Sequence, residues 1–243
     1  MPVAQATSTE PRQISVATLY RLSGLALLIA ALLQLMGWLM HPPGERLVDL
    51  LSPLQGPSHL LMFVSWLFAL LGLPGLYARQ AHRAGWLGLI GFVATIFAVA
   101  YHCYLVLYEA YPAVWLARNE ATGDLIATGG PLAHGAGALG PFGFATILAF
   151  PLLGIATVRA GVMPRWTGWL QIACVPAFLA GALGLALILP PGGPDGIPGP
   201  IQPIALLYYL LFAGYAGGGY ALWAKIEQAR EPVVQPGIQQ PAV

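Results

Sequence analysis

Long apolar runs are the feature that most constrains the fold of this chain. Six stretches of about 20 residues or more are nearly free of charge and are separated by short polar breaks. Only 8% of the 243 residues are charged, against about a quarter in soluble proteins. A helix needs about 20 apolar residues to cross the 30 Å hydrocarbon core of a bilayer. We therefore predict an all-α integral membrane protein, a six-helix bundle with spans at 17–40, 57–78, 85–109, 131–157, 166–190 and 201–224.

The two ends of the chain differ in composition from the apolar runs. Residues 1–16 and 226–243 are polar and contain proline and glutamine. We expect them to be tails that flank one transmembrane domain at 17–225. The first apolar run is longer than the hydrophobic region of a signal peptide and no A-x-A-like site follows it, so we expect a retained helix.

The basic residues are distributed unevenly between the predicted connections. Eight of the ten Lys and Arg residues lie in the N-terminal region, in the connections at 79–84 and 158–165, and in the C-terminal tail. Cytoplasmic connections retain Lys and Arg, so both termini are predicted to be cytoplasmic, in an inner or plasma membrane. We expect the lipid bilayer as a partner, with another membrane protein or a second copy of the chain, and no nucleic acid.

A weak internal repeat relates two parts of the chain. The second predicted span opens with GPSH and the fourth with GPLAH, and a basic turn follows each span. The third predicted span opens with Gly85-Trp86-Leu87, and the fifth contains Gly168-Trp169-Leu170 near its start. This pattern predicts a parallel repeat of spans 2–3 and 4–5, with a pseudo-two-fold axis along the membrane normal.

Four of the five histidines fall towards the predicted outer face. His59 and His134 begin the second and fourth spans, and His41 ends the first. His102 lies in the third span, about 10 Å below its outer end, and Glu109 follows two turns later on the same face. Because imidazole binds Zn, Cu and haem iron, we predict that His59 and His134 bind a b-type haem or a transition metal (Cu, Zn or Fe) in a redox role. His41, His102 and Glu109 are the predicted additional metal ligands.

The layout of these histidines resembles that of cytochrome b561-type transmembrane electron carriers. Those proteins have six spans, and a histidine pair on the second and fourth holds one haem. The resemblance implies His59 and His134 as that pair. It covers the layout alone, and the fifth span, 166–190, contains no histidine for a second haem.

Three other interpretations use the same residues differently. A histidine near the end of a span can simply contact headgroups and water. The glycine-rich fourth and sixth spans fit a cofactor-free transporter or accessory membrane subunit that acts through helix packing and partner contacts equally well. A membrane enzyme with His102 and Glu109 as acid and base is a third hypothesis, although no substrate-binding motif accompanies them.

Overall fold

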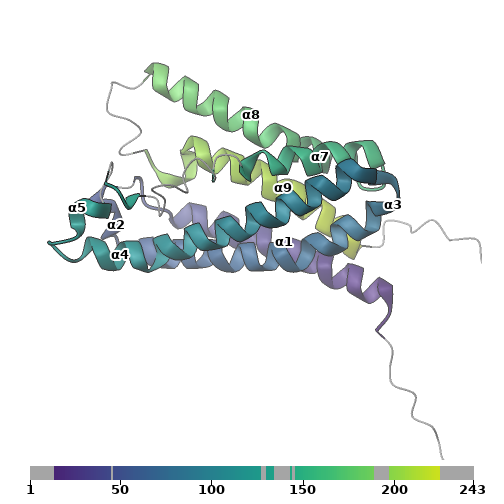
Figure 1. Cartoon of the computed structure of the whole chain (residues 1–243), viewed down its shortest axis with the longest axis horizontal. Helices are drawn as coiled ribbons and strands as arrows, with labels where there is room; N and C mark the ends of the chain where they lie inside the picture. Colours follow the sequence, from purple (N-terminus) through teal and green to yellow (C-terminus); the bar gives the residue numbers. More distant parts are fainter. Residues whose placement is uncertain are drawn as a thin grey trace, which may run out of the picture.

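A computed structural model describes residues 14–44, 46–126, 130–133, 143, 146–188 and 197–224. All regular secondary structure in these ranges is helical. Four helical runs are long and apolar enough to cross a membrane. These runs are α1 (Val16–Met40), α3 (Gln55–Ala110) continued by α4 (Pro112–Ala117), α8 (Arg165–Ile188) and α9 (Pro203–Trp223). The protein is thus all-helical in the described ranges, and these ranges contain four candidate membrane spans. Figure 1 shows how the helices lie alongside one another.

The helix boundaries follow local sequence signals. The side chain of Ser15 caps α1 by accepting a hydrogen bond from the backbone N–H of Thr18. Pro203 begins α9, where a proline loses no hydrogen bond. The short helix α7 (Ala149–Ala160) ends at Gly161, which has a φ of 63° and so adopts the left-handed conformation that glycine favours. Helix α3 begins at Gln55, two residues before Pro57, the predicted first helical residue.

Helix α3 consists of two antiparallel halves. Gly85 lies between them with φ 58° and ψ −158°, a conformation that side-chain-bearing residues rarely adopt. The rings of Tyr77 and Phe92 stack with centroids 4.5 Å apart, although a straight helix would separate them by about 22 Å. The halves coincide with the predicted second and third spans. The chain reversal brings the two ends of α3 together at one end of the bundle.

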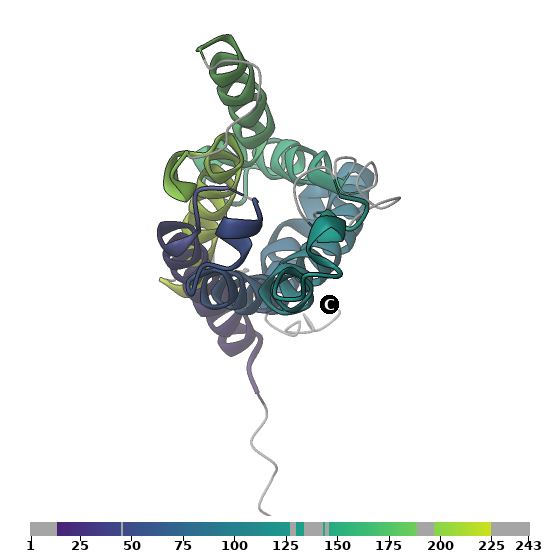
Figure 2. The ribbon, with the colours of Figure 1, turned by 90° about the vertical axis from the view of Figure 1, so that its left-hand side faces the viewer.

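The long helices and α7 form a closed ring. Helix α1 packs against α3 and α9, α9 against α8, α8 against α7, and α7 against α3. Figure 2 views this ring along the bundle, with α8 projecting away from its neighbours. We name the end at which α3 begins and finishes the His59 end, and the opposite end the Gly85 end. Helix α1 begins at the Gly85 end, because Arg79 lies over the ring of Tyr20, and α9 finishes there, because Gly219 contacts Gly24.

Aromatic side chains fill the interior of the ring. Trp66 is fully buried and its ring contacts His102 at 4.8 Å and Phe212 at 4.8 Å between centroids. Phe150 of α7 and Tyr208 of α9 complete the contacts around the indole. Since offset and edge-to-face aromatic contacts are favourable, this group holds α3, α7 and α9 together.

The predicted count of six spans stays a prediction. The fourth predicted span, 131–157, is interrupted in the described residues at 134–142, 144 and 145, and its end from Ala149 onward belongs to α7. The repeat also stays a prediction. Its two Gly-Trp-Leu sequences have different surroundings, because Gly85 is exposed at a chain reversal whereas Gly168 is buried in α8 against Gly154.

Close helix packing generates a prediction about Gly24. A β-carbon on Gly24 would collide with the carbonyl oxygen of Gly219, and one on Gly219 would lie 2.6 Å from the carbonyl oxygen of Gly24. We expect Gly24→Ala to destabilise the bundle by about 1–3 kcal/mol, because α1 and α9 must separate. Thermal unfolding of the detergent-solubilised protein measures this loss. The matched change Gly184→Ala places its methyl group in open space and should leave stability unchanged or slightly higher; an equal loss in both variants would contradict the packing argument.

Candidate functional site at the His59 end

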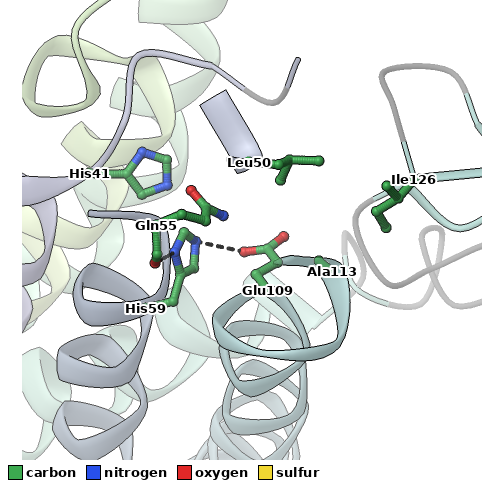
Figure 3. Close-up of a pocket in the computed structure, with 7 residues that line it drawn as sticks. All are labelled: His41, Leu50, Gln55, His59, Glu109, Ala113 and Ile126. Atoms are coloured by element: carbon green, nitrogen blue, oxygen red, sulfur yellow. Dashed lines mark hydrogen bonds and ion pairs between the residues drawn. The ribbon is translucent and has the colours of Figure 1, made fainter. Parts of the chain in front are cut away.

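A small pocket opens at the His59 end of the bundle. Its polar side chains come from three places in the chain. His41 follows α1, Gln55 and His59 lie at the beginning of α3, and Glu109 lies near the end of α3. The short helices α2 (Leu47–Leu50), α4 and α5 (Gly123–Ile126) cover it with apolar side chains. Its lining residues are His41, Leu50, Gln55, His59, Glu109, Ala113 and Ile126 (Figure 3). The enclosed space has room for about one water-sized group.

His59 and Glu109 form the centre of this pocket. The Nε2 atom of His59 lies 3.0 Å from Oε2 of Glu109, and the imidazole is buried. Its Nδ1 atom lies 2.8 Å from the carbonyl oxygen of Gln55. A carbonyl oxygen only accepts, so Nδ1 donates and Nε2 faces the carboxyl group. One proton is therefore shared between Nε2 and Oε2, from residues 50 positions apart in the sequence.

His41 contributes a second imidazole. Its Nδ1 atom donates to the carbonyl oxygen of Pro42 at 2.7 Å, which leaves Nε2 with a lone pair, and Nε2 points towards Gln55 and the pocket in Figure 3. Its ring stacks on Trp38 and approaches the His59 ring, in both cases with centroids 4.8 Å apart. Burial, and then the neighbouring His59, lower the pKa of His41 to about 4. The ring is therefore neutral at pH 7.

Gln55 is a pocket residue that sequence reasoning missed. Its side chain is buried, and Oε1 has no hydrogen-bond partner among the described residues. A buried acceptor without a partner is costly, so this oxygen is suited to a ligand in the pocket. Its spacing of four residues from His59, which places both on one face of a helix, is the signal that could have identified it.

Asp49 fixes the cover of the pocket. Its carboxylate accepts hydrogen bonds from Nε of Arg46 at 2.8 Å and from Nη2 at 3.2 Å, and it also accepts from the Arg46 backbone N–H. These hydrogen bonds, all donated by Arg46 and accepted by Asp49, stabilise the first turn of α2, whose Leu50 lines the pocket. Leu50 packs with Ala113, Ala117 and Ile126 in a small apolar cluster. The connections between the long helices thus shield His59 from the surroundings.

The other predicted site residues lie elsewhere. His102 is buried deeper in the bundle, where its Nδ1 donates to the carbonyl oxygen of Ala98 at 2.7 Å and its ring contacts Trp66. It does not line the pocket. His134 lies outside the described residues, so its predicted pairing with His59 stays a prediction. No three His, Cys, Asp or Glu side chains in the described ranges are placed together closely enough to hold a metal as they stand.

The low pKa of His41 predicts how stability depends on pH. The unfolded chain binds a proton at His41 near pH 6.5, whereas the folded chain binds it only near pH 4. The unfolded state thus binds more protons between these values, and the free energy of unfolding should fall by up to about 3 kcal/mol as the pH drops from 6.5 to 4. The variant His41→Asn retains a donor for Pro42 without titrating. Chemical unfolding across this pH range should show a smaller loss for this variant; identical profiles would contradict the assignment.

Comparison of the chain with models of known protein families, with curated proteins and with solved structures finds no match. The functional assignment of the pocket therefore rests on the chemistry and geometry of its own side chains.

Proposed function

We propose that the protein is a multi-pass membrane protein that binds a transition-metal ion in the pocket at the His59 end and uses it in a redox role. The observation that carries this proposal is the orientation of the histidines. His41 and His59 each donate Nδ1–H to a backbone carbonyl oxygen and thereby present Nε2 on the pocket side. Metal-binding histidines are usually held by such a second hydrogen bond, which fixes the tautomer and the ring direction.

The carboxyl group of Glu109 supports the same proposal. Two ligand atoms that each lie about 2.1 Å from one ion are separated by about 3.0–3.4 Å at the usual coordination angles. The atoms Nε2 of His59 and Oε2 of Glu109 lie 3.0 Å apart. An ion can therefore replace the proton that they share with little movement of either side chain. His41 would have to turn towards them to complete a set of two imidazoles and one carboxylate, which suits Zn, Cu or Fe.

The size of the pocket favours an ion over a haem. Its space admits about one water-sized group, whereas a haem is many times larger. Haem binding by His59 and His134 is a separate proposal that depends on a residue outside the described ranges. Elemental analysis detects a bound ion, whereas a Soret absorption band detects a haem.

Contacting aromatic rings support the redox part of the proposal. They lead from His41 to Trp38, with ring centroids 4.8 Å apart, and from Trp38 to Tyr208 at 5.6 Å. Tyr208 in turn contacts His102, with centroids 5.7 Å apart. Electron transfer weakens steeply with distance, so rings in contact offer a route from the pocket into the bundle. Copper and iron would supply the redox chemistry that zinc lacks.

A metal-binding measurement tests the proposal. The purified protein in detergent should bind close to one equivalent of Cu²⁺ or Zn²⁺ in equilibrium dialysis followed by elemental analysis. The double variant His59→Leu/Glu109→Leu removes both partners of the pair, so neither remains buried alone, and affinity should fall more than about 100-fold. The control His82→Leu changes an exposed histidine at the Gly85 end and should bind normally.

Further readouts separate the alternatives. A Soret band that disappears in both His59→Leu and His134→Leu, while the proteins still insert, would assign a haem instead. Folding of every variant is checked by circular dichroism and thermal unfolding. A well-folded wild-type protein that binds no metal and no haem would overturn the proposal and favour a cofactor-free transporter or accessory subunit.

A further inference from the structure

Arginine residues gather at the Gly85 end without described carboxylates near them. The four acidic residues in the described ranges all belong to segments at the His59 end, namely Asp49, Glu109, Glu120 and Asp124. The Gly85 end carries five arginines instead, namely Arg21, Arg79, Arg83, Arg159 and Arg165. Clustered like charges repel one another, so this end of the bundle favours an anionic partner.

Two chain reversals bring the segments that carry three of these arginines side by side. Nε2 of Gln80 donates to Oγ1 of Thr157 at 3.1 Å in the buried interface between α3 and α7. Arg83 lies one helical turn after Gln80, and Arg159 lies two residues after Thr157. The hydrogen bond therefore holds the reversal at Gly85 beside the end of α7.

The turn between α7 and α8 adds the third arginine. Gly161 ends α7 in the left-handed conformation, and Arg165 begins α8 four residues later. One guanidinium nitrogen of Arg165, Nη2, lies 4.0 Å from the point that a β-carbon of Gly161 would occupy. The side chain thus folds back over the turn. Arg83, Arg159 and Arg165 are all exposed on these adjoining turns.

Exposed tryptophans surround the same turns. Trp86 is 79% exposed, Trp166 54% and Trp169 57%. Tryptophan concentrates at the headgroup level of membranes, where its ring is partly apolar and its N–H meets polar groups. This pattern predicts that the turns with Arg83, Arg159 and Arg165 lie at the headgroup level, where lipid phosphates are found.

We propose that the reversals at Gly85 and Gly161 form a binding site for the phosphate of an anionic phospholipid, held by Arg83, Arg159 and Arg165. Guanidinium groups bind phosphate oxygens in pairs, and basic clusters beside membrane helices recognise anionic headgroups. The apolar faces of α3 and α8 next to the turns, which include Ile90 and Trp169, accommodate the acyl chains. This site lies at the opposite end of the bundle from the metal pocket and does not depend on it.

The test measures thermal unfolding of delipidated protein in detergent. Phosphatidylglycerol at about 100 times its dissociation constant should raise the unfolding temperature by about 5 °C or more. Phosphatidylcholine and inorganic phosphate should raise it much less, since one lacks net charge and the other lacks acyl chains. An equal rise with phosphatidylcholine would show unspecific lipid binding, and an equal rise with phosphate would show a site for the free anion; either result would overturn the proposal.

Variants identify the residues that bind the lipid. The triple variant Arg83→Gln/Arg159→Gln/Arg165→Gln should lose the response to phosphatidylglycerol. The corresponding triple lysine variant, which keeps the charge without paired donors, should retain a weaker response. Arg118→Gln removes an exposed arginine at the His59 end and should respond like wild type. Native mass spectrometry should show one fewer retained anionic lipid for the triple glutamine variant alone.

Two results would contradict this assignment. A triple glutamine variant that folds and keeps the full response would exclude these arginines. A well-folded wild-type protein that does not respond to phosphatidylglycerol would overturn the proposal itself.

Discussion

The reversal of α3 at Gly85 is the constraint on which the rest of the structure depends. A residue with φ 58° and ψ −158° ends one helix and starts another in the opposite direction. The two halves then lie side by side over their full length, so that His59 meets Glu109 at one end while Gln80 meets Thr157 of α7 near the other. Both candidate sites therefore follow from a single backbone conformation and from the packing that surrounds it.

The pocket at the His59 end shows how a membrane bundle can keep polar groups close to apolar surroundings. Buried polar atoms are costly unless they are hydrogen-bonded. The histidines meet this requirement by donating to carbonyl oxygens four residues earlier in α3, or to the adjacent Pro42 in the case of His41. The same hydrogen bonds turn each Nε2 away from the helix backbone. The hydrogen bonds that satisfy the Nδ1 atoms of the imidazoles thus also orient the rings for a ligand. Gln55 is one of several buried side chains in the described ranges with a polar atom that has no partner, and its Oε1 is the one such atom that belongs to a residue lining the pocket.

Glycine residues at the helix interfaces allow neighbouring helices to pack closely. Gly24 and Gly219 allow the backbones of α1 and α9 to approach, and Gly154 and Gly168 do the same for α7 and α8. The hydrophobic effect does not drive helices together within lipid, because their apolar side chains are already out of water. Close packing therefore supplies much of the attraction between helices. Trp66 and the rings around it then set the spacing of the remaining helices. The position of the pocket is a consequence of these contacts.

The sequence by itself determined the helical class and the approximate boundaries of the long helices α1, α8 and α9, because bilayer thickness translates directly into the length of an apolar run. The run at 17–40 became Val16–Met40, and that at 166–190 became Arg165–Ile188. It also identified His41, His59 and Glu109 as polar residues near one end. Only the tertiary structure decided that Glu109 contacts His59, that Gln55 joins them and that His102 lies apart. Hydropathy shows how deep a residue lies, whereas the packing of side chains sets the rotation of each helix about its axis and thereby determines which residues meet.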